Sequence, residues 1–185
     1  MSKTFTAKNL AYCGIFVALL SVSGIFTIPL TNGALSLQVA VVFILACILE
    51  RRLAVLTVIA YLILGLVGLP VFAKGGGFGY VLQPTFGFLA SFVFGAFALS
   101  TIYQSSKFSK KVVAYVVGII VTLFIVYTLG TTYMYFLFKL TTDNPFSFAK
   151  IISFAVTPYI LVDIGKAVIA YFIIIALEKA LRINQ

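Results

Sequence analysis

An acid and a base inside a long apolar run constrain this chain more than any other feature. Asp163 and Lys166 lie within an otherwise apolar stretch, residues 151–177, which is long enough to cross a membrane. A charge near the middle of a membrane helix costs about 2.5–3.5 kcal/mol on insertion scales. Their three-residue spacing puts both side chains on one helix face. That face must meet a partner helix or a polar cavity, because lipid cannot solvate it.

The composition favours an integral membrane protein. The chain is 63% hydrophobic and 9% charged, with a mean hydropathy of +1.20, whereas soluble domains are about 45–50% apolar and about 25% charged. The net charge of +9 does not indicate nucleic-acid binding, because the basic residues separate apolar runs instead of sharing one surface. The first apolar run lacks a small-residue cleavage site and is expected to stay as a helix.

Hydropathy predicts an all-α protein built as a bundle of six transmembrane helices, forming one transmembrane domain over residues 1–185. The expected spans are residues 10–28, 37–49, 53–69, 84–103, 112–138 and 151–177. The second is short, so we expect the preceding loop, with its turn residues Thr31 and Asn32, to dip into the membrane. The fifth is long, so we expect it to be tilted or broken.

The distribution of basic residues predicts the orientation. Nine Lys and Arg residues, Lys3 and Lys107 among them, fall on one side of the six spans, and three fall on the other: Lys74, Lys139 and Lys150. Because cytoplasmic loops carry the excess of basic residues, both termini are expected in the cytoplasm, which makes this a multi-pass protein of the cell membrane. The loops after the first, third and fifth spans then face outward.

The intramembrane pair has two interpretations. Asp163 and Lys166 could form an ion pair that holds helices together, or they could bind a ligand, which is the default for ionisable groups within a membrane. As ligand groups, Lys166 would donate to a carboxylate and Asp163 would accept from N–H groups.

A glycine-rich loop and two glutamines give further candidates. Residues 74–80 read Lys-Gly-Gly-Gly-Phe-Gly-Tyr, in which glycine allows close backbone approach to a ligand and Phe78 and Tyr80 could cover it. The alternative is a plain flexible turn. Gln38 lies at the start of the second span, and Gln83 lies just before the fourth. Both could face an outward cavity or cap the end of a helix.

Small residues draw a stripe down the first span: Ala7, Ala11, Gly14, Ala18 and Ser21. Such a stripe allows close approach of another helix, either within the bundle or on a separate membrane subunit, for which Ala7, Ala11 and Gly14 are the candidate docking residues. The shorter stripe Gly87, Ser91 and Gly95 is assigned to packing inside the bundle.

The sequence lacks the residues that several kinds of enzyme and metal chemistry require. The sequence has no His, only four acidic residues and no Cys/His metal spacing, so we expect no enzyme activity, no catalytic residue, no metal and no cofactor. The glycine loop lacks the Gly-Lys-Ser/Thr of a phosphate loop. If ATP drives transport, another subunit must bind it.

Several blocks together resemble the BioY family, the biotin-specific S-components of energy-coupling-factor (ECF) vitamin transporters. They are residues 64–73, Leu-Gly-Leu-Val-Gly-Leu-Pro-Val-Phe-Ala; the glycine loop with Pro84-Thr85-Phe86-Gly87-Phe88; Ile28-Pro29-Leu30; Ser36-Leu37-Gln38; and Pro158 to Lys166. The resemblance runs from Ala7 to Leu181. Phe86-Gly87-Phe88 departs from the usual Pro-Thr-Gly-Gly-Tyr run, which we expect to alter packing and not substrate class.

The resemblance implies a six-helix subunit that captures biotin outside and delivers it to the cytoplasm. It implies a membrane coupling subunit and two ATP-binding cassette ATPases as partners, with the stretch around Ala7 and Ala11 facing the coupling subunit. Asp163, Lys166, Gln38, Phe78, Tyr80 and Gln83 are the expected biotin-binding residues. The main alternative is a stand-alone proton-coupled carrier of a small carboxylate, with Asp163 as the coupling residue. A second alternative is a membrane enzyme that acts on a lipid, with Asp163 as its base, although the sequence offers no partner acid.

Overall fold

The computed structural model describes residues 6–30, 33–105, 110–143 and 145–183. Its helices are α1 (Ala7–Ile25), α2 (Gln38–Ile48), α3 (Arg51–Val67), the 3-10 helix η1 (Phe78–Leu82), α4 (Phe86–Tyr103), α5 (Lys111–Thr141), α6 (Phe148–Ala155) and α7 (Thr157–Ile183). The strands β1 (Thr27–Leu30) and β2 (Gly33–Ser36) lie between α1 and α2. The predicted residues Thr31, Asn32, Lys3 and Lys107 lie outside the described residues.

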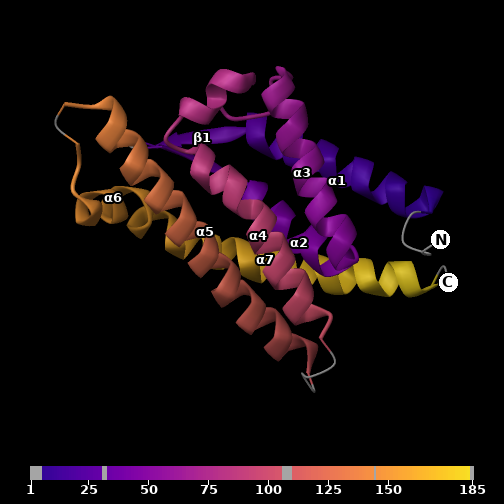
Figure 1. Ribbon diagram of the computed structural model, residues 1–185. Helices are drawn as coiled ribbons and strands as arrows, with labels where there is room; N and C mark the ends of the chain where they lie inside the picture. The colour runs from indigo at the N-terminus through magenta and orange to yellow at the C-terminus, as the bar shows by residue number, and fades with distance from the viewer. Residues whose placement is uncertain (1–5, 31–32, 106–109, 144, 184–185) are drawn as a thin grey trace.

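Four of the described helices, α1, α4, α5 and α7, are long and apolar enough to cross a membrane. α2 is apolar but has 11 residues, and α3 has 17. The chain is therefore an all-helical membrane protein, whereas the count of six crossings and the cytoplasmic termini stay predictions. The start of α1 and the end of α7 lie at the same end of the bundle (Figure 1), as an even number of crossings requires.

The sequence prediction differs from the structure in two places, the loop after the first span and the last apolar run. The loop after the first span is an antiparallel hairpin, in which Thr27 pairs with Ser36 and Leu30 with Gly33. The long fifth span is one unbroken helix of 31 residues, which excludes a break and leaves a tilted helix as the prediction. The last run is instead two helices, because α6 ends at Ala155 and α7 begins at Thr157, with Pro158 in its first turn, where a missing N–H costs least.

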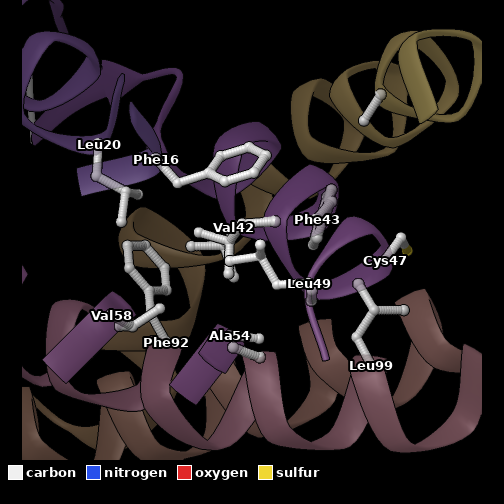
Figure 2. Close-up of a cluster of buried hydrophobic side chains, with 14 of the residues drawn as sticks. Phe16, Leu20, Val42, Phe43, Cys47, Leu49, Ala54, Val58, Phe92 and Leu99 are labelled. Carbon is white, nitrogen blue, oxygen red and sulfur yellow. The ribbon is translucent and has the colours of Figure 1, made fainter. Parts of the chain in front are cut away.

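The main core cluster takes side chains from α1, α2, α3, α4, α5 and α7. Phe16 and Leu20 from α1 meet Val42 and Phe43 from α2, and Val58 of α3 closes the cluster (Figure 2). These side chains are buried within the protein, whereas the outer faces of the helices expose leucine, isoleucine and phenylalanine as lipid requires.

Close packing of α4 on α5 depends on small residues. Gly87, Ser91 and Gly95 are all buried, and a Cβ atom on Gly87 would collide with the Tyr133 side chain. The stripe on α4 therefore packs inside the bundle, as expected. α5 in turn contacts α6, whose Ile151 and Ala155 pack against Met134 of α5.

Candidate functional site

Contacts at one end of the bundle place α2, α4, α5 and α7 at a common level. The side chain of Gln104, which follows α4, donates to the Leu49 carbonyl at the end of α2 over 2.7 Å. Its neighbour Tyr103 donates to Glu178 of α7 over 3.2 Å, and Lys111 of α5 donates to the same carboxylate over 2.6 Å. These contacts hold the ends of α2, α4, α5 and α7 together.

Polar residues further along these helices reach one cavity. At 1.5 Å per residue, Gln38 lies about 16 Å from Leu49 along α2, and Lys166 lies about 18 Å from Glu178 along α7. Asp163 and Tyr127 lie about one turn further along α7 and α5. These four residues belong to the wall of one cavity of about 710 Å³.

The cavity is lined by most of the predicted site residues. It contacts Gln38, Tyr80, Gln83, Asp163 and Lys166, together with Thr27, Ser36, Val39, Ala73, Lys74, Pro84, Thr85, Phe88, Leu89, Phe92, Val126, Tyr127, Met134, Phe138, Phe154, Ala155 and Tyr159. The wall is thus mainly apolar and aromatic, with a few polar groups placed on it. This is the usual make-up of a small-molecule site.

The acid and the base form an ion pair within α7. Lys166 Nζ lies 2.8 Å from Asp163 Oδ1, and both residues are buried. Tyr127 of α5 donates its hydroxyl to Asp163 Oδ2 over 2.7 Å. The pair is thus not a bridge between helices, since Tyr127 makes the contact across to α5. Each carboxylate oxygen keeps a lone pair, and Lys166 keeps two N–H donors, for a molecule in the cavity.

Gln38 sits where the short helix α2 begins. Its side chain is 4% exposed. Ser36 Oγ donates to its Oε1 over 3.1 Å, and its Nε2 donates to the Tyr61 hydroxyl. The amide thus has protein partners on both ends and still reaches the cavity wall.

The glycine loop is fixed by hydrogen bonds and is not a flexible turn. Phe72 and Gly75 exchange two backbone hydrogen bonds of 2.9 and 3.0 Å, and the Gly77 amide donates to the Gly65 carbonyl over 2.7 Å. Gly75 and Gly77 have φ of 104° and 102°, which favours glycine. The buried ring of Phe72 lies flat over Gly65, where a Cβ atom would collide with it. The loop therefore forms a rigid wall beside the cavity.

The two aromatic residues of this loop have different positions. Tyr80 is buried, packs on Phe72 with ring centroids 4.6 Å apart, and lines the cavity. Phe78 is 79% exposed and is not among the lining residues, so this geometry does not support the lid role expected for it. Lys74, which was not assigned from sequence, does line the cavity.

The small-residue stripe of α1 points away from the bundle. Ala7, Ala11, Gly14 and Ala18 are exposed, whereas the opposite face buries Phe16, Leu20, Ser23 and Gly24. A Cβ atom on Gly14 would meet nothing within 4 Å. Packing inside the same bundle is therefore not the role of this stripe in the described chain.

Comparisons with known proteins agree on one family. A crystal structure of the S-component for biotin from an ECF-type ABC transporter superposes with a TM-score of 0.74 over 97% of this chain and 95% of that one, at 22% identity, which establishes a shared fold. The biotin transporter BioY of Thermotoga maritima is 33% identical over 93% of this chain and 96% of its own length. A probable biotin transporter BioY of Lysinibacillus sphaericus is 36% identical over 73% of this chain and 68% of its own. The model of the BioY family matches residues 1–183. The family model and these relatives agree with the shared fold, and the chain belongs to the BioY family.

Proposed function

We propose that this chain is the biotin-binding S-component of an ECF-type transporter, which captures biotin at the outer face and delivers it to the cytoplasm with an ATP-driven coupling module. The observation that carries the proposal is the buried Asp163–Lys166 pair on the wall of a mainly apolar cavity. Biotin is apolar over most of its surface and polar at its two ends, a ureido group and a carboxylate. A cavity of about 710 Å³ falls within the usual range for small-molecule sites.

The charges along the cavity give biotin an orientation. Within the part of the chain that the structure describes, the charged lining residues are Lys74, Asp163 and Lys166. Asp163 and Lys166 neutralise each other at 2.8 Å, which leaves Lys74 as the cation without a partner on the wall. The carboxylate of biotin therefore lies toward Lys74 on the glycine loop.

The ureido group then lies at the depth of the ion pair. It has two N–H donors on either side of a carbonyl acceptor. Asp163 has acceptor capacity left for an N–H, and Lys166 has donors left for the carbonyl. A ureido group thus matches the pair without adding a net charge to a buried site, whereas a second carboxylate at this depth would not.

The exposed stripe on α1 supports a partner in the membrane. Small exposed residues on this face, Ala7, Ala11 and Gly14, would allow a helix of the coupling subunit to approach the backbone of α1 closely. Two ATP-binding cassette ATPases would bind that subunit and supply the energy, since this chain carries no phosphate loop. The chain itself would then be a transport subunit of the cell membrane and not an enzyme. The proton-coupled carrier with Asp163 as coupling residue is less well supported, because the relatives bear the names of biotin transporters.

Biotin binding by the purified full chain in detergent tests the proposal. Wild type should bind biotin, and Asp163→Asn and Lys166→Ala should each weaken binding by about tenfold to a hundredfold, since a hydrogen bond to a charged group contributes about 1.5–3 kcal/mol. The matched controls are Glu178→Gln and Lys111→Ala, which break the other ion pair, far from the cavity. Near-wild-type affinity in both site variants would contradict the assignment.

A further inference from the structure

The side-chain amide of Gln38 has a defined orientation, and a residue outside the cavity fixes it. Tyr61 of α3 is fully buried and is not among the lining residues. Its hydroxyl donates to the backbone carbonyl of Val71 over 3.1 Å. A hydroxyl carries one proton, so the side of the Tyr61 oxygen that faces Gln38 can only accept.

This arrangement decides which end of the amide faces Tyr61. Gln38 must turn its NH₂ group toward the Tyr61 oxygen and its Oε1 toward Ser36 Oγ, 3.1 Å away. With the amide flipped, Tyr61 would have to donate to Oε1, and the Val71 carbonyl would lose its only described donor. Leaving this part-buried carbonyl without a donor opposes the flip, since a fully buried polar group without a partner costs about 1–3 kcal/mol.

The last turn of α1 closes this network. A Cβ atom placed on Gly24 would collide with the Val71 carbonyl oxygen and would lie 3.0 Å from Gln38 Nε2 and 3.1 Å from the Tyr61 hydroxyl. No side chain fits at this position. The backbone of α1 therefore covers the hydrogen bonds and excludes water that would otherwise compete for the amide.

We propose that Tyr61 is a positioning residue for ligand recognition, which holds the Gln38 amide so that its second N–H and the remaining lone pair of Oε1 face the cavity as a fixed donor and acceptor. The inference rests on the proposed function. A fixed donor–acceptor pair matches the carbonyl and an N–H of the biotin ureido group, which the proposed orientation places in the same cavity beside Asp163 and Lys166. Tyr61 thus sets specificity for the ureido group without touching the ligand.

A double-mutant cycle separates positioning from a general structural role. Biotin affinity is measured in detergent for wild type, Tyr61→Phe, Gln38→Ala and the double variant. Tyr61→Phe should weaken binding about tenfold in the wild-type background and less than about twofold in the Gln38→Ala background, because the residue that it positions is then absent. The matched control is Tyr115→Phe, which removes a buried hydroxyl that donates to the Ala167 carbonyl over 2.7 Å, since neither of these residues lines the cavity. An equal loss in both backgrounds, or no loss, would overturn the inference.

A ligand change gives a second readout. In 2-iminobiotin a nitrogen replaces the ureido carbonyl oxygen, so the ratio of its dissociation constant to that of biotin reports how well the site tells an acceptor from a donor. Tyr61→Phe should lower this ratio, as should Gly24→Ala, whose Cβ would collide with the Val71 carbonyl oxygen and crowd the Gln38 amide and the Tyr61 hydroxyl without changing the chemistry of either side chain. An unchanged ratio in folded variants would contradict the inference. If the wild-type chain does not bind biotin at all, the proposed function fails first, and the inference fails with it.

Discussion

Breaking the ion pair on one side should harm the protein more than removing it entirely. In Asp163→Asn, Lys166 keeps its charge and loses its counterion, although it is buried. At 2.8 Å and an effective dielectric constant of about 20, the lost attraction is about 6 kcal/mol. Part of it is offset because Asn needs less desolvation and can still accept from Tyr127. Breaking buried pairs on one side costs about 3–5 kcal/mol net, and we expect a loss in that range.

The double variant Asp163→Asn/Lys166→Met removes both charges. Replacing a buried ion pair by neutral groups of similar size is often neutral or stabilising, so its unfolding free energy should lie within about 2 kcal/mol of wild type. It should nevertheless fail to bind biotin, because the groups that match the ureido end are gone. The measurement is unfolding of the ligand-free protein in detergent, followed by a binding titration.

The result that would refute this reasoning is a double variant as unstable as Asp163→Asn alone. The ion pair would then have a structural role, in which it holds the bundle together through the contact of Asp163 with Tyr127 of α5. Ligand binding would not be its main role. The loss of stability in Asp163→Asn is compared with that in Glu178→Gln, which breaks the exposed Lys111–Glu178 pair and should cost about 1 kcal/mol or less.

Three further predictions test other parts of the site. Ala11→Trp should abolish co-purification with a co-expressed coupling subunit and leave biotin affinity unchanged, whereas the equally exposed Ala60→Trp on α3 should keep the complex; a complex that survives Ala11→Trp would remove the stripe from the interface. Gly65→Ala should lower thermal stability and biotin affinity together, because its Cβ would displace Phe72 and with it the glycine loop; a stable variant with unchanged affinity would show that the loop is not a fixed wall. Lys74→Met should weaken binding of biotin several-fold but not that of biotin amide, which lacks the negative charge, and an equal effect on both ligands would contradict the proposed orientation.

The helical architecture could be predicted because hydrocarbon permits few solutions for a polar backbone. The break at Val156 could not, because both sides of it are apolar and membrane helices often tolerate proline, so Pro158 gave no clear signal. The hairpin between α1 and α2 was also missed. Its four-residue strands are too short for an alternating pattern to show, and their pairing depends on the helices around them.

The candidate site was partly predictable for a related reason. Charged and amide groups inside apolar runs must face protein or a cavity, and Gln38, Asp163 and Lys166 all reach the cavity wall. Phe78 does not line the cavity. Its position could not be predicted, because the sequence does not tell which way an aromatic side chain in a loop points. Tyr127 was overlooked because tyrosine is common in membrane helices. Whether these residues contact biotin stays a prediction.

The shortness of α2 has a consequence for the distance that a substrate still has to travel. Its 11 residues cover about 16 Å of a hydrocarbon layer about 30 Å thick. With both termini in the cytoplasm, as predicted, a molecule beside Gln38 would rest about halfway across this layer. The buried side chains between Gln38 and the far end of α2 are Val42, Phe43, Leu45, Ala46, Cys47 and Leu49. Under the proposed function, the ATP-driven step has to move the ligand past this packed half.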